Sequence, residues 1–256
     1  MKTVAITGGT RGIGFGMAQA LLAGGHRVAV CGTDPERIGK VRAELPESAL
    51  VHAADVTDRA QVQGFWDAAA ERFEGVDIWI NNAGVSHPRT PMWELTADEA
   101  RKVLNTNLLG VLNGCAVAVP AMAARGRGHI WNMEGLGSDG RSVPGLGVYG
   151  ASKRAVTYLT EALAEESPDQ VTVGLLSPGM VVTDLLVDGY RDPAELAKAR
   201  KVFNILADRV ETVAPWLAER AVTRTRNGAH VQWLTTGKVL RRFAAAPFHT
   251  RDLFAD

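Results

Sequence analysis

The chain has 256 residues, and its 28 Lys and Arg residues balance 28 Asp and Glu residues, so the formal net charge is zero. Without a basic tract, nucleic-acid binding is not expected, because neutralising phosphates requires clustered cations. The only cysteines, Cys31 and Cys115, are too few for a zinc centre or a disulfide framework, which favours a metal-free protein of the reducing cytoplasm. We find no leader peptide and no run of about 18 apolar residues, and therefore expect no transmembrane segment.

From the N-terminus, short runs rich in β-branched residues alternate with longer amphipathic stretches. The first third of the chain predicts a strand over residues 4–7, a helix over 14–22, a strand over 27–31, a helix over 35–45, a strand over 49–53, a helix over 58–73 and a strand over 78–80. Pro35 suits the first turn of the second helix. Thr57 or Asp58 can cap the third helix.

The rest of the chain continues the alternation. It predicts a helix over residues 96–124 with room for a bend, a strand over 129–133, a helix over 148–166, a strand over 171–176, helices over 194–206 and 211–218, and a last strand over 229–233. Strands that alternate with helices form βαβ units with a parallel sheet. With no linker or repeat, the sequence predicts one α/β domain over residues 1–256, a doubly wound parallel sheet of about seven strands with helices on both faces.

A glycine-rich loop joins the first predicted strand to the first predicted helix. It consists of Thr7, Gly8, Gly9, Thr10, Arg11, Gly12, Ile13 and Gly14. Glycines allow a tight turn and close approach of the backbone to a pyrophosphate, which the first amides of the helix can bind. Glycines alone indicate only a turn, but their place at the first strand–helix junction favours a dinucleotide site of the Rossmann type.

The residues after the second predicted strand bear on the choice of nicotinamide cofactor. An acidic side chain there would hold the ribose hydroxyls and repel a 2′-phosphate. Gly32 and Thr33 occupy that place and Asp34 follows late, whereas Arg11 and the Thr33 hydroxyl can face a 2′-phosphate. This pattern favours NADPH. If Arg11 is instead a solvated surface charge and Asp34 a helix cap, NAD is possible as well.

Tyr149 and Lys153 are four positions apart in a predicted helix, so they share one face and lie one turn apart. An unperturbed tyrosine has a pKa of about 10, too high for efficient proton exchange at neutral pH. A neighbouring ammonium group favours the phenolate and lowers that pKa. Taken alone, such a pair is a common surface arrangement, and it indicates catalysis only beside other motifs.

Those motifs follow the ends of other predicted strands, where an open parallel sheet binds its ligand. They are Asp55 and Val56 after the third strand, Asn82, Ala83 and Gly84 after the fourth, and Pro178, Gly179 and Thr183 after the sixth, with Asn107 in the long helix. Together with the glycine loop and the Tyr149/Lys153 pair, they resemble the short-chain dehydrogenase/reductase family. The resemblance extends over nearly the whole chain.

The resemblance implies Tyr149 as the proton donor, Lys153 as a ligand of the nicotinamide ribose, and Asn107 as the holder of a relay water. It further implies that Asn82 and Gly84 shape the cofactor cleft. Contacts of Val181 and Thr183 with the nicotinamide carboxamide are implied as well, and so is assembly into a homodimer or homotetramer.

One position departs from the family pattern. The catalytic serine is expected between the fifth strand and Tyr149, where this chain has Gly135 or Leu136. Ser138 is the nearest hydroxyl, and we hypothesise that its glycine-rich loop brings it to the substrate carbonyl. The alternative is a loop serine that caps a turn.

Four strings point to one branch of the family: WNMEGLGSDGR at residues 131–141, YGASKR at 149–154, GMVVTDLL at 179–186 and FNILA at 203–207. They resemble the chlorophyll b reductases of the NON-YELLOW COLORING type, which implies NADPH-dependent reduction of the 7-formyl group to hydroxymethyl. The expected partner is then a small-molecule carbonyl substrate, here a large hydrophobic pigment.

Apolar candidates for the wall of a large pocket are Trp93, Met133, Leu136, Met180, Leu185, Leu186 and Phe203. For any single one of them, core or oligomer packing is the more common role. Two other functions stay open. The chain can act on a different ketone or alcohol (an acyl thioester, a steroid or a sugar-like compound), or it can be a non-catalytic NADP sensor, which would have little need of the Tyr149/Lys153 pair.

Overall fold

Seven parallel strands form one sheet in the order β3-β2-β1-β4-β5-β6-β9 in the structure, a computed structural model that describes residues 1–248 and 251–254. The strands are β1 Thr3–Ile6, β2 Arg27–Gly32, β3 Leu50–Ala53, β4 Ile78–Asn81, β5 Gly128–Met133, β6 Val171–Ser177 and β9 Ala229–Gln232. The chain winds outward from β1 in one direction and from β4 in the other. This order confirms the predicted doubly wound α/β fold, and it places a ligand site at the carboxyl ends of β1 and β4.

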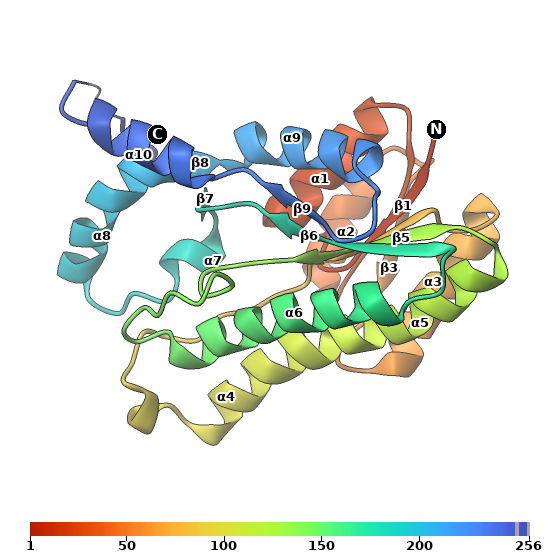
Figure 1. Cartoon of the computed structure of the whole chain (residues 1–256), viewed down its shortest axis with the longest axis horizontal. Helices are drawn as coiled ribbons and strands as arrows, with labels where there is room; N and C mark the ends of the chain where they lie inside the picture. The colour runs from red at the N-terminus through yellow and green to blue at the C-terminus, as the bar shows by residue number, and fades with distance from the viewer. Residues whose placement is uncertain (249–250, 255–256) are drawn as a thin grey trace.

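Helices cover both faces of this sheet (Figure 1). They are α1 Gly12–Ala23, α2 Pro35–Glu44, α3 Arg59–Phe73, α4 Ala97–Leu104, α5 Gly110–Ala124, α6 Gly147–Glu166, α7 Asp184–Val187, α8 Pro193–Leu206, α9 Val210–Thr223 and α10 Thr236–Ala245. Buried residues of α1, α2 and α9 form one hydrophobic core with the sheet, and those of α3, α5 and α6 form the other.

Neighbouring residues of a strand contribute to opposite cores. In β1, Val4 and Ile6 pack under α1, α2 and α9, while Ala5 packs under α3, α5 and α6. All four residues of β1 and all four of β4 are buried. Strands that are buried on both faces form continuous apolar runs, which is why the sequence located them.

The predicted ends of most elements agree with the structure to within two residues, and Pro35 and Asp58 occupy the helix starts predicted for them. One helix is longer than predicted: α9 continues to Thr223 because its buried face extends to Ala221. Several elements were not predicted. They are the 3-10 turn η1 Met92–Glu94, the strands β7 Val181–Val182 and β8 Asp208–Arg209, and the helices α7 and α10.

The helix predicted over residues 96–124 is α4, a π-helical turn η2 Asn105–Leu109, and α5 in direct succession. Thr96 and Glu99 close a capping box at its start, with the Glu99 amide donating to the Thr96 hydroxyl at 3.2 Å. The segment is long and apolar enough to cross a membrane, and half of its most apolar stretch is buried in the fold. A core helix meets the same criteria, so these 28 residues are weak evidence for a span.

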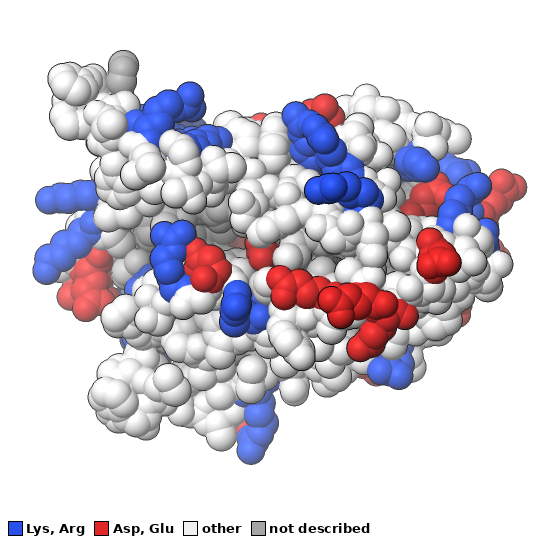
Figure 2. Space-filling model, in the orientation of Figure 1, with Lys and Arg blue, Asp and Glu red and all other residues white. Residues whose placement is uncertain are grey.

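Charges of both signs share the face of the molecule drawn in Figure 2. Acidic side chains gather along α6, which carries the exposed Glu161, Glu165 and Glu166. Basic side chains gather over α10, which carries Lys238 and Arg241. The charge on this face is therefore mixed rather than of one sign.

Candidate active site

The glycine loop between β1 and α1 is shaped for close approach by a ligand. Gly8 and Gly12 have φ angles of +62° and +54°, in the left-handed region that favours glycine. A Cβ on Gly8 would lie 2.7 Å from the Ala83 Cα, and one on Gly14 would lie 2.7 Å from the Gly8 carbonyl oxygen. Arg11 makes no capping bond to α1, so the first amides of this helix stay open to an anion. This loop fits a pyrophosphate.

Thr7 and Asn82 lock the loop to the end of β4. The Thr7 hydroxyl accepts the backbone amides of Asn82 at 3.0 Å and Ala83 at 3.1 Å. The Asn82 side-chain amide donates to the carbonyl oxygens of Thr7 at 2.9 Å and Gly8 at 3.0 Å. Thr7 is buried, and it supports the cleft from below instead of lining it.

One cavity of about 1160 Å³ runs along the carboxyl ends of the strands. Pockets for a single small molecule commonly measure roughly 300–1,000 Å³, so this one has room for a cofactor and a substrate. The predicted site residues that line it are Gly8, Thr10, Arg11, Gly12, Ile13, Gly14, Thr33, Asp55, Val56, Asn82, Ala83, Gly84, Tyr149, Lys153, Pro178, Gly179, Val181 and Thr183. Three predicted residues, Thr7, Asn107 and Ser138, lie outside its lining.

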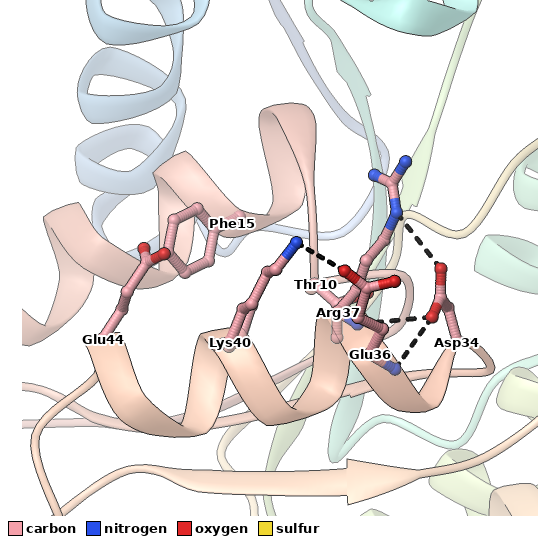
Figure 3. A pocket seen from close by; sticks show the side chains of 8 residues that line it. Thr10, Phe15, Asp34, Glu36, Arg37, Lys40 and Glu44 are labelled. Atoms are coloured by element: carbon pink, nitrogen blue, oxygen red, sulfur yellow. Dashed lines mark hydrogen bonds and ion pairs between the residues drawn. The ribbon is translucent and has the colours of Figure 1, made fainter.

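At the outer end of the cavity, Asp34 caps α2 by accepting the amides of Glu36 at 3.0 Å and Arg37 at 3.3 Å (Figure 3). Its carboxylate also pairs with the Arg37 guanidinium at 3.3 Å. Arg37 and Arg11 both reach the Asp184 carboxylate, at 3.7 and 3.5 Å. The guanidinium groups of Arg11 and Arg37 therefore flank the Asp184 carboxylate. The other carboxylate, that of Asp34 near the end of β2, caps α2. A smaller cavity of about 380 Å³ adjoins this end.

Tyr149 and Lys153 lie on the buried face of α6, and both line the cavity. Among the described residues the Tyr149 hydroxyl has no hydrogen-bond partner. Lys153 donates from Nζ to the carbonyl oxygen of Met133 at 3.1 Å. A Cβ on Gly84 would lie 3.6 Å from the Lys153 Nζ and 3.4 Å from the Asn107 Oδ1, so a glycine at this position keeps the space between those two polar groups open.

Asn107 is fully buried, and its side chain is held at both ends. Its Oδ1 accepts the Val85 amide at 2.8 Å, and its Nδ2 donates to the Val85 carbonyl at 2.9 Å and to the Ser152 hydroxyl at 3.0 Å. The π turn η2 supplies this orientation, because the Gly110 amide bonds to the carbonyl of Asn105, five residues back. Single π turns inside α-helices are frequent at functional sites.

Burial shifts the pKa values of Tyr149 and Lys153 in opposite directions. It raises the pKa of Tyr149 to about 12 and lowers the pKa of Lys153 to about 8. The sequence predicted that the ammonium lowers the pKa of Tyr149; in the protein alone burial outweighs any such effect, because removal from water disfavours the charged form of each group. At neutral pH the pair is therefore a phenol beside an ammonium, the forms needed to donate a proton.

Ser138 is not brought to the tyrosine hydroxyl. Its own hydroxyl accepts the Gly135 amide at 3.2 Å and donates to the Lys153 carbonyl at 3.3 Å, which ties the loop after β5 to α6. Gly135 faces the hydroxyl instead, and a Cβ there would lie 2.5 Å from the Tyr149 oxygen. A side chain at position 135 would fit only if it or the Tyr149 side chain shifted. A catalytic role of Ser138 stays a prediction without geometric support.

Glu134 adds a buried carboxylate that the sequence argument did not single out. Its Oε2 lies 2.7 Å from the Nε2 of His230, and its Oε1 accepts the Thr157 hydroxyl at 3.1 Å. The Glu134 charge raises the pKa of Lys153, against the larger effect of burial. The sequence could have indicated Glu134, because a charged residue directly after a buried strand is unusual.

The inner part of the cavity is apolar. Of the predicted wall residues, Met133, Leu136, Met180, Leu185, Leu186 and Phe203 line it. Trp93 does not, because it projects from η1 with 85% of its surface exposed. Arg37, Arg89 and Tyr190 also line the cavity and were missed, since nothing in their local sequence marks them.

A family model described as short chain dehydrogenase matches residues 2–193. The chloroplastic chlorophyll(ide) b reductase NOL of Oryza sativa subsp. japonica is 36% identical over 97% of this chain and 76% of its own length. The Arabidopsis thaliana protein of the same name is 38% identical over 84% of this chain, and the chain spans 63% of that relative. An NADPH-dependent pterin aldehyde reductase of Arabidopsis thaliana is 32% identical over 80% of this chain and 86% of its own length.

Solved structures agree with these sequence relatives. A 3-ketoacyl-(acyl-carrier-protein) reductase from Brucella melitensis complexed with NADH superposes with a TM-score of 0.81 at 28% identity, covering 91% of this chain and 96% of that one. A levodione reductase gives a TM-score of 0.81 at 26% identity, covering 93% and 97%. The glycine loop, the Tyr149/Lys153 pair, the family match and these structures together show that the chain belongs to the short-chain dehydrogenase/reductase family and is an NAD(P)-dependent oxidoreductase.

Proposed function

We propose that this protein reduces the 7-formyl group of chlorophyll b, or of a close relative, to hydroxymethyl with NADPH. The observation that carries the proposal is that one large cavity is lined by the glycine loop, by Tyr149 and Lys153, and by a set of apolar side chains. The choice of pigment is supported by the chlorophyll(ide) b reductases that align with nearly the whole chain. A flat, largely apolar ring system suits the Leu136, Met180 and Phe203 wall.

Nicotinamide bound in this cleft would supply the hydride that the carbonyl carbon accepts. Tyr149 donates its phenolic proton to the alkoxide oxygen that develops there. The Lys153 ammonium stabilises the phenolate that remains, because an opposite charge nearby favours the ionised form. Asn107 is held by Val85 and Ser152 and borders the space beside the Lys153 Nζ. It can hold a relay water there, through which Tyr149 regains its proton by way of Lys153.

The preference for NADPH rests on the outer end of the cavity. Arg11 and Arg37 flank Asp184 there, and Thr10 and Thr33 add hydroxyl groups. A 2′-phosphate between the two guanidinium groups would take the place of the Asp184 carboxylate as their anion. Asp34 caps α2, an arrangement that leaves NAD possible, so the preference for NADPH depends on the two guanidinium groups and not on Asp34.

The test is a steady-state assay of the purified chain with NADPH and a panel of carbonyl compounds that includes chlorophyll b. The expected outcome is a hydroxymethyl product from the pigment and a lower kcat/KM with NADH than with NADPH. A strong preference for NADH would contradict the cofactor proposal. Turnover of other carbonyls, with none of the pigment, would contradict the substrate proposal.

A smaller aldehyde or ketone is the second candidate substrate. It is favoured by the similarity to a pterin aldehyde reductase and by the structural likeness to a 3-ketoacyl-(acyl-carrier-protein) reductase. The same panel separates it from the pigment. Cofactor binding without turnover of any compound would instead support a non-catalytic sensor, a function for which the buried Tyr149/Lys153 pair has no evident use.

A further inference from the structure

Arg89 lies where three loops of the substrate side meet. Its backbone amide donates to the Gly189 carbonyl at 2.9 Å, and the Thr90 amide beside it donates to the Gly145 carbonyl at 3.2 Å. A Cβ on Gly145 would lie 3.4 Å from the Arg89 Cβ. The segment after β4 is thereby joined to the loop before α6 and to the loop between α7 and α8. The Arg89 side chain is half-buried, and it lines the large cavity.

The guanidinium of Arg89 is held by a ring and lacks an anion. Its Cζ lies 4.4 Å from the centre of the Tyr190 ring, which also lines the cavity. Within residues 1–248 and 251–254, no carboxylate lies at ion-pair distance from it, whereas Arg191 next to the ring pairs with Glu99 at 3.9 Å. A guanidinium stacked on an aromatic face keeps its N–H edge free for a planar anion.

The acidic side chains that share the cavity are engaged elsewhere. Asp34 and Asp184 pair with arginines at the outer end, and Glu134 pairs with His230. Asp55 accepts the Thr57 amide at 2.9 Å. A half-buried cation beside apolar walls costs free energy unless an anion offsets it. None of the carboxylates that line this cavity among the described residues offsets Arg89, so an anionic group of the ligand can do so.

We propose that the Arg89 guanidinium, stacked on Tyr190, binds a carboxylate of the substrate. The inference rests on the proposed function and narrows it: among the proposed pigments, chlorophyllide b, the relative with a free carboxylate, is preferred over chlorophyll b, in which that carboxylate is esterified. Carboxylates pair with arginine through two parallel hydrogen bonds, which fixes orientation as well as affinity. The pair would thus orient the formyl group relative to Tyr149.

The test compares two ligands that differ only in this group, chlorophyllide b and its methyl ester. Binding of each to the full chain saturated with NADP⁺ is titrated by pigment absorbance, and kcat/KM with NADPH is measured in parallel. Charged hydrogen bonds are typically worth enough for a change of roughly tenfold to a hundredfold, so the wild-type chain should bind the acid tighter by that ratio. The Kd for NADPH should be the same throughout.

Variants locate the effect. Arg89→Leu should reduce the affinity for the acid to that for the ester and leave the ester unchanged, while Arg89→Lys should restore part of the preference because it keeps the charge. Arg191→Leu is the matched control from the neighbouring loop, and it should retain the full ratio since Arg191 does not line the cavity.

Equal binding of acid and ester by the wild type would overturn this inference alone and leave the pigment proposal intact. An equal loss of both ligands in Arg89→Leu would also overturn it, because the residue would then shape the wall without recognising the charge. Binding and turnover of neither ligand would overturn the inference and the proposed substrate together.

Discussion

The two ends of the cavity are held in different ways. At the cofactor end, short side chains and backbone groups form a network of hydrogen bonds. The side chains of Thr7 and Asn82 contribute four of these bonds, which join the segments that follow β1 and β4. At the substrate end, the loops carry apolar side chains and one arginine stacked on a ring. The cofactor end is thus held by many short hydrogen bonds, and the substrate end by side-chain packing and loop contacts.

The largest expected effect lies between the two ends. Replacing Tyr149 by Phe removes the phenolic proton and should lower kcat by a factor on the order of 10² or more. The network of hydrogen bonds at the cofactor end is untouched, so the Kd for NADPH should not change. Steady-state kinetics and a fluorescence titration with NADPH measure the two quantities. Full activity of Tyr149→Phe would exclude this tyrosine as the acid.

The rigidity of the cofactor end can be tested with Gly8→Ala. The new Cβ would adopt a left-handed conformation that costs roughly 1–2 kcal/mol and would contact the Ala83 backbone, so NADPH should bind about tenfold more weakly or worse. Gly39→Ala on α2, where a Cβ meets nothing within 4 Å, is the matched control. If isothermal titration calorimetry gives both variants the wild-type affinity for NADPH, the glycine loop can adjust to a side chain at position 8, and its close packing does not limit cofactor binding.

The activity should also depend on pH through Lys153, whose pKa burial lowers to about 8. As the pH rises through this value the ammonium is lost, and kcat/KM for carbonyl reduction should fall about tenfold per unit above it. Glu134 raises that pKa, so Glu134→Gln should move the fall to lower pH, and Glu134→Asp should partly restore it. Thr157 on α6 and His230 on β9 also face the carboxylate and stay in place. A profile that does not move in Glu134→Gln would show that the carboxylate has no effect on the lysine.

A smaller effect is expected at Arg37, which is about 40% exposed at the outer end. Arg37→Ala should raise the KM for NADPH several-fold and leave the KM for NADH unchanged, because only the 2′-phosphate loses a partner. Comparison of the two cofactors at fixed substrate measures this ratio. A parallel rise for NADH would place Arg37 in general cofactor binding instead.

The smallest effect on turnover is expected at Ser138. Its hydroxyl holds a loop, so Ser138→Ala should cost about 1 kcal/mol of the free energy of unfolding and leave kcat near that of the wild type. Urea denaturation and the carbonyl assay give the two values. A loss of turnover comparable to that of Tyr149→Phe would restore this serine to the catalytic set.

The sequence located the strands and most of the predicted residues that line the cavity, because these depend on local spacing: glycines at a strand–helix junction, and two side chains one helical turn apart. It did not locate Arg89, whose role depends on loops that are distant in sequence and join at Gly145 and Gly189. The same holds for Ser138, since the motif gave its presence but not the direction of its hydroxyl. The two-residue strands β7 and β8 were missed because they form by pairing with each other across a distance in sequence, and α7 was missed because four residues are too few to show a helical pattern.

The π turn between α4 and α5 sets the direction of the Asn107 side chain relative to α5. It holds one residue more than an α-helical turn, and each residue of a helix turns the chain by about 100°. Deleting a single residue there would leave an unbroken helix, yet Asn107 would point about a quarter turn away from Lys153 while α5 kept its packing. The extra residue thus acts as a spacer that lets one continuous helix pack α5 in the core and direct the Asn107 side chain to Val85 and Ser152.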